Sequence, residues 1–381
     1  MKHYRWHKFV ISFLRVVAGP IIRRLMRYKC VKYKGPDVPS IIISNHNTDL
    51  DPVLVELGFS RHMYFLASEH AFRNGFPSKL MKALFGPIPI NKTRADVASV
   101  KEIIRRVKAG ASICFFAEGD RSFNGETSSP AISAAKLVRA SGADLITFRL
   151  TGGYLTSPRW SKKFRKGRMT GSVVNRYTSD WIAGKTDEQL RSAIEQDIYE
   201  NAYSRQEKEH VRYCGKDLAE HIETVLYLCP KCMKTGTIKS EGNIFSCGCG
   251  LHAAYTETGF LEGDLPFTTI KQWDEWQSGQ LGKIIDSAGE GPICADANQQ
   301  LFEVKPAAGM TPAGEGPMSI DKDAFHCAGM SFPLESISRF AIAGKMTLLF
   351  SLKNGTTYEV RSPYPRSALK YREIFRQITD N

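Results

Sequence analysis

The sequence predicts an α/β core, followed by a cysteine-rich segment and a small domain built mostly of β-strands. Short apolar runs alternate with amphipathic helical segments up to residue 150. Four of the nine cysteines fall within residues 229–249, and short strand-like runs occupy the C-terminal part of the chain. With 381 residues, 42% of them hydrophobic, the chain is long enough for two or three packed domains.

The first 36 residues combine helically spaced apolar side chains with many cations and no acidic residue. Apolar residues recur from Phe9 to Leu25, but Arg15 and Gly19-Pro20 keep the apolar stretch shorter than the roughly 20 residues of a membrane span. We therefore expect an interfacial helix that lies on an anionic membrane surface. A helix docked on the protein core, with its basic face in solvent, is the alternative.

Charge and cysteine content indicate where the protein works. Residues 1–168 hold 30 Lys and Arg against 11 Asp and Glu, so the basic surface belongs to the N-terminal half. Within residues 158–168, PRWSKKFRKGR, the rings of Trp160 and Phe164 are expected to add to the membrane contact. An odd number of cysteines favours a reducing compartment. We expect a peripheral protein on the cytoplasmic face of a membrane.

Strands and helices alternate in the N-terminal half of the chain. The expected strands cover residues 41–45, 63–67, 86–91, 111–119 and 144–150, and the expected helices cover residues 52–59, 94–110 and 128–142. In the last helix, Ser129 is the expected cap and Gly142 the expected end. The chain from there to residue 228 is expected to be mostly helical. In α/β sheets, ligand-binding residues follow the carboxyl ends of the strands.

A histidine follows the first expected strand, in the sequence ISNHNTDLDP at residues 43–52. On a continuous helix, His46 and Asp51 would point about 140° apart and could not pair. If His46 ends the strand and Asp51 opens the next helix, the turn between them can bring the carboxylate onto the imidazole and raise its basicity. The pattern then gives a general base. A structural or solvated histidine beside a helix cap is the alternative.

Polar residues also follow two other expected strands. FFAEGDRSFNGE places Glu118, Gly119 and Arg121 after one apolar strand, and GPIPINK ends in Lys92. Glycine lets the backbone approach a ligand closely, and a guanidinium can hold a phosphate through two parallel hydrogen bonds. These residues are candidates for binding a phosphorylated substrate. A turn that carries a surface cation is the alternative for either segment.

In this order, NHNTDLD, GPIPINK and FAEGDRS resemble the signature blocks of the phospholipid/glycerol acyltransferase family, which includes lysophosphatidic acid acyltransferases. The resemblance covers residues 1–215. It matches His46 and Asp51 to the family's catalytic pair, Gly86 and Lys92 to its second block, and Glu118, Gly119 and Arg121 to its third. Two positions depart from the family pattern. Asp120 stands where the third block usually has Thr, and Phe148 stands where a fourth block usually has Pro.

The resemblance implies a mixed-sheet core and a defined reaction. His46 would take the proton of an acceptor hydroxyl as its oxygen attacks the thioester of acyl-CoA or acyl carrier protein, and Asp51 would stabilise the imidazolium. The substrate-binding residues would be Lys92, Glu118, Gly119 and Arg121. A backbone N–H near Lys92 or Gly119 would stabilise the oxyanion. The expected acceptor is a lysophospholipid, 1-acylglycerol 3-phosphate, and the product phosphatidic acid, which defines an O-acyltransferase of the 1-acyl-sn-glycerol-3-phosphate acyltransferase type.

The cysteine cluster CPKCMKTGTIKSEGNIFSCGCG has the spacing of a metal site. Cys229 and Cys232 form a CxxC knuckle, and Cys247 and Cys249 form a tighter CxC. Four thiolates satisfy the tetrahedral preference of zinc, so we expect a structural zinc ribbon, in which His252 could replace Cys249. A redox dithiol is the alternative, but no thioredoxin-like βαβ pattern surrounds the cluster.

Short alternating runs near the C-terminus predict a small β domain. Strands are expected in residues 336–344, 346–352 and 354–362, with Asn354-Gly355 as a hairpin turn, and a closing helix in residues 366–380. This arrangement resembles a pleckstrin-homology domain. The expected domains are an interfacial helix at 1–36, an acyltransferase domain at 37–215, a zinc ribbon at 216–264 and a β-rich domain at 265–381.

Two other functional classes fit parts of the pattern. A zinc ribbon in a basic protein could bind nucleic acid, but the charged residues within 225–255 are only Lys231, Lys234, Lys239 and Glu241. Because the strongly basic segments lie elsewhere, we expect no nucleic-acid partner. An acyltransferase domain that has lost its activity could instead serve as a lipid-binding scaffold.

Overall fold

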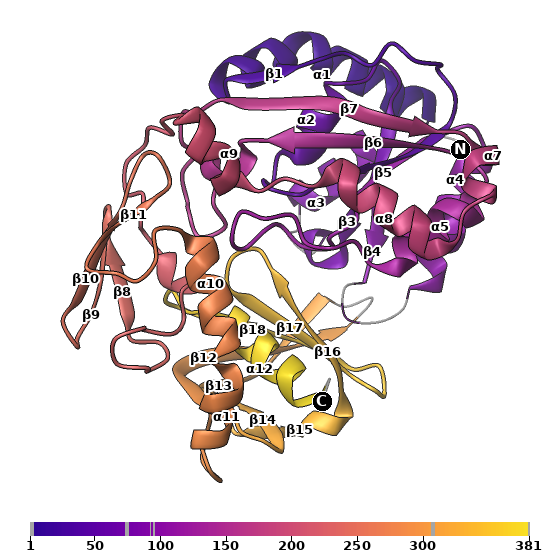
Figure 1. Cartoon of the computed structure of the whole chain (residues 1–381). Helices are drawn as coiled ribbons and strands as arrows, with labels where there is room; N and C mark the ends of the chain where they lie inside the picture. Colours follow the sequence, from indigo (N-terminus) through magenta and orange to yellow (C-terminus); the bar gives the residue numbers. More distant parts are fainter. Residues whose placement is uncertain (1–3, 73–75, 92, 94–95, 306–308, 380–381) are drawn as a thin grey trace. The chain divides into compact units, whose positions relative to one another are not determined.

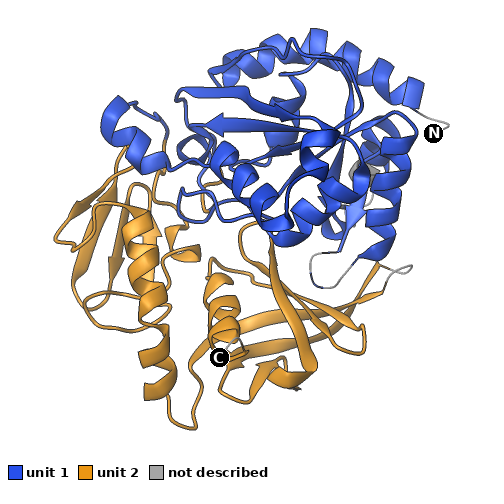
Figure 2. Cartoon of the chain, turned by 45° about the vertical axis from the view of Figure 1, so that its right-hand side comes forward, with its two compact units in different colours: residues 1–159, 163–215 blue, residues 160–162, 216–381 orange. Residues whose placement is uncertain are grey.

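The computed structural model describes residues 4–72, 76–91, 93, 96–305 and 309–379 (Figure 1). The chain divides into two compact units, and Figure 2 shows them in different colours. The first unit comprises residues 1–159 and 163–215, and the second comprises residues 160–162 and 216–381. Lys92 lies outside the described residues, so its substrate-binding role stays a prediction.

The first unit is built on a seven-stranded sheet with the strand order β1-β7-β6-β2-β5-β3-β4. Its strands are β1 (Tyr28–Cys30), β2 (Ser40–Ser44), β3 (Met63–Ser68), β4 (Ile88–Ile90), β5 (Ser112–Phe116), β6 (Asp144–Thr151) and β7 (Met169–Tyr177). All neighbours run parallel except β6 and β7, which are antiparallel. Strand β2 is central and buried along its whole length, as its run of isoleucines predicts. The predicted mixed α/β core is confirmed.

Helices cover both faces of this sheet. They are α1 (Tyr4–Leu25), α2 (Asp51–Glu56), α3 (Phe76–Phe85), α4 (Val97–Lys108), α5 (Ile132–Ser141), α6 (Gly153–Thr156), α7 (Ser179–Ala183), α8 (Asp187–Ile198) and α9 (Ala202–Glu209), with the 3₁₀ turn η1 (Glu69–Phe72). Side chains of α4, α5 and α8 share one apolar core with the sheet, and those of α2 share a second core with it. The short helix α2 is thereby fixed beside the end of β2.

Two details of the first unit differ from the sequence-based expectation. The chain beyond residue 150 was expected to be mostly helical, and strand β7 contradicts this prediction. The strand was not predicted because Gly171, Asn175 and Arg176 break its apolar pattern. The helix α5 begins after Ala131 rather than at Ser129, whose hydroxyl donates to Glu195 instead. Its predicted end at Gly142 is confirmed, since that residue is in the left-handed conformation with φ +64°.

The second unit contains two antiparallel sheets. The smaller has the order β11-β10-β9-β8 and comprises β8 (Ile238–Glu241), β9 (Ile244–Cys247), β10 (Leu251–Tyr255) and β11 (Leu261–Gly263). The larger has the order β15-β14-β13-β12-β18-β17-β16 and comprises β12 (Cys294–Lys305), β13 (Gly309–Ile320), β14 (Ala324–Cys327), β15 (Met330–Pro333), β16 (Ile337–Ala343), β17 (Thr347–Leu352) and β18 (Thr357–Arg361). The helical elements are η2 (Ile222–Thr224), α10 (Ile270–Gly279), α11 (Leu281–Ser287), η3 (Leu334–Ser336) and α12 (Leu369–Thr379).

The β-rich C-terminal region is confirmed, together with its closing helix α12. The predicted hairpin joins β17 to β18, and Gly355 supplies the positive φ of +93° that its turn requires. The long strands β12 and β13 were not predicted, because glycine and proline such as Pro312 and Gly314 lie inside β13.

One predicted membrane contact is wrong. Trp160 is fully buried within the second unit, where its indole N–H donates to the Leu218 carbonyl at 3.1 Å. Its ring packs edge-on against Tyr255, with the centroids 5.4 Å apart. The aromatic side chain therefore serves packing rather than lipid contact, while Phe164 is half exposed.

Candidate active site

His46 and Asp51 form a close pair beside the carboxyl end of β2. Asp51 begins α2, and the turn before it brings its Oδ2 to 2.9 Å from Nδ1 of His46. The Asp51 side chain is fully buried, whereas that of His46 remains 21% exposed. The imidazole also stacks on Phe116 of β5, with the ring centroids 4.1 Å apart. Since Nδ1 faces the carboxylate, Nε2 is the nitrogen left to face a substrate.

The carboxylate of Asp51 is held by the turn that it closes. Its Oδ2 accepts hydrogen bonds from the backbone N–H groups of Asn47 at 2.5 Å and Thr48 at 2.8 Å. Its Oδ1 accepts one from the Thr48 hydroxyl at 2.7 Å. These donors fix the orientation of the carboxylate, which in turn orients the imidazole. The pair is therefore preorganised by residues within five positions of His46.

Glu118 holds the backbone of His46 from the neighbouring strand. Ser44 at the end of β2 is paired with Phe116 at the end of β5. His46 and Glu118 each follow these residues by two positions, so they lie next to each other at the edge of the sheet. Accordingly, the His46 N–H donates to Oε1 of Glu118 at 2.6 Å, and the Ser128 N–H donates to Oε2 at 2.8 Å. Burial raises the pKa of Glu118 to about 8, against the opposing effect of these two donors.

This raised pKa predicts how stability depends on pH. Between pH 4.5 and about 8, folded Glu118 keeps a proton that the unfolded chain releases, so the free energy of unfolding should fall as the pH rises through this range. Glu118→Gln removes the titrating group and should reduce that fall, as measured by urea unfolding at pH 5 and pH 8. Glu207→Gln, an exposed change on α9, is the control. An equal pH dependence in wild type and Glu118→Gln would contradict the assignment.

Arg121 is engaged by the same segment of chain. Its Nε donates to the Asn47 carbonyl at 2.9 Å and its Nη2 to the Ser157 carbonyl at 2.7 Å. Its Nη1 donates to Oδ2 of Asp49 at 2.9 Å, and that aspartate side chain is 74% exposed. The guanidinium thus supports the turn that follows His46. The phosphate-binding role of Arg121 stays a prediction.

The two predicted glycines occupy tight turns. Gly119 has φ +75°, and its N–H donates to the Phe116 carbonyl at 3.2 Å, so the turn itself uses this candidate oxyanion donor. Gly86 has φ +56° and lies against His7 of α1, where an added Cβ would come within 2.5 Å of the His7 ring. Both positions require glycine for conformational reasons.

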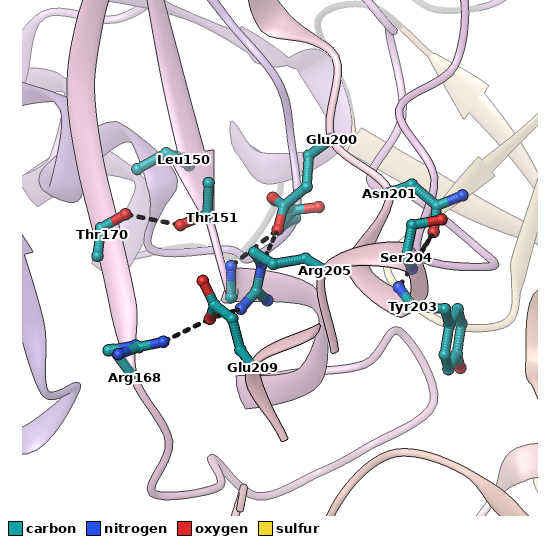
Figure 3. A network of polar contacts seen from close by, with 12 residues as sticks. Leu150, Thr151, Arg168, Thr170, Glu200, Asn201, Tyr203, Ser204, Arg205 and Glu209 are labelled. Atoms are coloured by element: carbon teal, nitrogen blue, oxygen red, sulfur yellow. Dashed lines mark hydrogen bonds and ion pairs between the residues drawn. The ribbon is translucent and has the colours of Figure 1, made fainter. Parts of the chain in front are cut away.

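A buried glutamate that the sequence did not single out, Glu200, belongs to a network of polar contacts with Arg205, Glu209 and Arg168 (Figure 3). Glu200 lies between α8 and α9, and its Oε1 accepts hydrogen bonds from the Gly152 N–H and from Nε of Arg205, each at 3.0 Å. Its Oε2 lies 3.4 Å from Nδ2 of Asn47, the neighbour of His46. One carboxylate therefore contacts both the histidine turn and the turn after β6. Because 153 residues separate Glu200 from Asn47, no local pattern could have revealed this contact.

Charged side chains continue this network outward. Arg205 pairs with Glu209 at 2.9 Å, and Glu209 pairs with Arg168 at 2.5 Å, as Figure 3 shows. The backbone of Glu200 also exchanges hydrogen bonds with Thr127, next to the Ser128 N–H that binds Glu118. The segment around residue 200 thus supports the histidine turn by two routes.

Glu200→Gln should lower kcat by about tenfold with little change in KM. The amide has one acceptor oxygen in place of two, so it cannot hold the Gly152, Arg205 and Asn47 donors together, and His46 loses part of its support. Steady-state kinetics well below the unfolding temperature separate kcat from KM, and Glu207→Gln again serves as the control. An unchanged kcat with a lowered stability would make Glu200 purely structural.

The four predicted metal ligands come together in the second unit. Their sulfur atoms all lie within 4.8 Å of one another, with 3.7 Å between those of Cys229 and Cys249 and 3.8 Å between those of Cys232 and Cys247. Four sulfurs placed ~2.3 Å from a tetrahedral zinc ion would be ~3.8 Å apart. None of the nine cysteines, all within the described residues, forms a disulfide. His252 is exposed on β10 and does not belong to this group.

The fold and the site together define an α/β domain with a histidine and its carboxylate partner at the carboxyl ends of parallel strands. Residues 27–151 match the family described as Acyltransferase. Among solved structures, the chain is similar to the 1-acyl-sn-glycerophosphate (LPA) acyltransferase PlsC from Thermotoga maritima. That similarity has 20% sequence identity over 53% of this chain and 80% of the other, with a TM-score of 0.43. No curated protein matches the chain.

Proposed function

We propose that this protein transfers a fatty acyl group from acyl-CoA or acyl carrier protein to the free hydroxyl of 1-acylglycerol 3-phosphate, giving phosphatidic acid. The pair of His46 and Asp51, held by buried hydrogen bonds within an acyltransferase-family domain, is the observation that carries this proposal. Nε2 of His46 takes the hydroxyl proton as the oxygen attacks the thioester carbon. The C–S bond then breaks, and the imidazolium returns the proton to the departing thiolate.

Arg121 can bind the phosphate of the acceptor. The Arg121 side chain is buried, but the Asp49 carboxylate that occupies its Nη1 is 74% exposed and can leave toward solvent. A phosphate can therefore replace Asp49 on Nη1 while Nε and Nη2 keep their contacts with the backbone. Bound in this way, the acceptor would have its hydroxyl near His46, because Arg121 contacts the residue next to it.

The test is to incubate the purified protein with labelled acyl-CoA or acyl carrier protein and a panel of lysolipids. Labelled phosphatidic acid formed from 1-acylglycerol 3-phosphate is the expected product. Transfer to a different lysolipid only would refute the proposed acceptor. No transfer to any member of the panel would favour the lipid-binding scaffold.

We also propose that α1 holds the protein on the cytoplasmic face of a membrane. Two of its arginines contact the domain, since Arg15 pairs with Glu56 at 2.7 Å and Arg23 donates to the Leu57 carbonyl at 3.1 Å. Its large apolar side chains are instead exposed, and these are Trp6, Phe9, Phe13, Val16, Val17, Ile21 and Leu25. No helix within the described residues combines the length and apolar character of a membrane span. An apolar stripe turned away from the protein suits insertion into the interfacial region of a bilayer.

Phe9→Asp combined with Phe13→Asp should abolish flotation with anionic liposomes. Phe9 is 64% exposed and Phe13 is 58% exposed, so the change removes membrane-facing rings without creating a core cavity. Val97→Asp, which adds a carboxylate at another exposed apolar position, is the control. If the double variant floated like wild type at both low and high salt, α1 would be excluded as the membrane contact.

We further propose that Cys229, Cys232, Cys247 and Cys249 hold a structural zinc ion. The sulfur separations fit a tetrahedral ion, and the four-thiolate set leaves no open position for a substrate. Cys229 and Cys232 precede β8, while Cys247 ends β9 and Cys249 follows it. Because Ile238 at the start of β8 is paired with Cys247, the ion would lie at one end of this strand pair.

A further inference from the structure

The larger sheet of the second unit ends beside a groove of about 980 Å³. One wall is the first part of β16, from Ile337 to Phe340, and the other is the last part of α12, from Arg372 to Thr379. Phe340 and Phe375 are both buried and give the groove an apolar floor. Neither the catalytic pair nor the cysteine cluster lies in this groove.

One wall of the groove is an edge strand. Among the described residues, β16 is the last strand of its sheet and pairs with β17 alone, from Ile337 opposite Leu352 to Ala343 opposite Thr347. Within the part that lines the groove, Ser338 and Arg339 are exposed. The outer edge of such a strand presents backbone N–H and C=O groups that an extended chain can pair with.

The groove is also locally cationic. Five of its lining side chains are basic, namely Lys322, Arg339, Lys353, Arg372 and Arg376, whereas two are acidic, Asp323 and Glu335. This excess contrasts with the rest of the unit, because residues 216–381 contain 16 Lys and Arg against 20 Asp and Glu. Glu373 pairs with both Arg372, at 2.8 Å, and Arg376, at 3.5 Å, so counting it with Asp323 and Glu335 leaves a formal excess of two positive charges around the groove.

We propose that this groove binds an extended acidic peptide segment of a partner protein, which adds a strand to the outer edge of β16. Backbone hydrogen bonds to β16 would supply register, and every second side chain would point the same way. Carboxylates on one side would meet Arg339 and Arg376, while apolar side chains would pack toward Phe375 and Ile378. This interaction is independent of acyl transfer and would recruit the enzyme to a partner.

The placement of the cations favours a peptide over a lipid headgroup. They come from four separate segments, namely the turns after β13 and β17, the strand β16 and the helix α12. Four residues of an extended strand span about 13 Å, a length that suits several spaced carboxylates better than one phosphate.

Fluorescence anisotropy of a labelled seven-residue probe of alternating valine and glutamate, titrated with the full chain, tests the proposal. Wild type should bind saturably, and Arg339→Glu combined with Arg376→Glu should weaken Kd by about tenfold or more. Lys283→Glu is the matched control, because Lys283 is an exposed cation of α11 outside the groove. A probe methylated on every second backbone nitrogen should also bind about tenfold more weakly, since it cannot complete the strand pairing.

Several results would overturn the proposal. One is a lack of saturable binding to wild type up to millimolar protein. Another is an equal loss of affinity in Lys283→Glu, which would show unspecific charge attraction. Equal binding of the methylated probe would remove the strand-addition mode. If the two arginines were needed for sedimentation with anionic vesicles but not for probe binding, the groove would be a lipid site instead.

Discussion

His46→Ala is expected to lower the turnover of acyl transfer by about 10²- to 10⁴-fold while the protein stays folded. The imidazole is partly exposed, and Asp51 keeps its three hydrogen bonds from Asn47 and Thr48 when the ring is removed. Alanine therefore deletes the proton acceptor without leaving the buried carboxylate unpaired. Single-turnover transfer from labelled acyl-CoA measures the loss, and thermal unfolding confirms that the fold is retained.

His252→Ala is the matched control for this experiment, because His252 is an exposed histidine on the strand β10. It should leave both transfer and metal content unchanged. Near-normal transfer by His46→Ala would remove the general base from the proposed mechanism. A complete loss of folded protein would instead show that His46 is structural, the alternative that its place beside a helix start also allows.

The strands that could be predicted are those that the composition of their own residues identifies. Strands β2 and β5 are buried on both faces, so their sequences are continuous apolar runs. Strand β7 and the long hairpin of β12 and β13 contain glycine, proline and charged residues. These residues interrupt the alternation of apolar and polar side chains that identifies a strand, so sequence periodicity did not report these strands.

The candidate site divides in the same way. His46 and Asp51 are five residues apart, and the turn between them is closed by its own N–H groups, so their pairing followed from local geometry. The chemistry of Arg121 was recognisable, but its contacts with Asn47 and Ser157 were not, because they depend on how the strand ends meet. Glu200 was missed for that reason too, since its significance arises only once the fold brings it to Asn47.

Removal of the metal should have the largest effect on stability. Structural zinc in small domains contributes an apparent ~10–16 kcal/mol, which is comparable with the ~5–15 kcal/mol by which a typical folded protein is stable. Cys232→Ser removes one thiolate and should lower bound zinc from one ion per chain to less than about a tenth of that. It should also lower the unfolding temperature of the second unit, because the turns around β8 and β9 lose their common anchor.

Elemental analysis of purified protein and thermal unfolding before and after chelation measure these effects. Cys30→Ser, at a partly buried cysteine of the first unit, is the control and should keep its zinc. A cysteine cluster that acts as a redox dithiol would behave differently. It would contain no zinc even after growth with added metal, and mild oxidation would lower the mass of the protein by two hydrogens for each disulfide formed. The separations of 3.7 Å between Cys229 and Cys249 and 3.8 Å between Cys232 and Cys247 match the ~3.8 Å expected between two ligands of a tetrahedral zinc ion, so the geometry favours the zinc outcome.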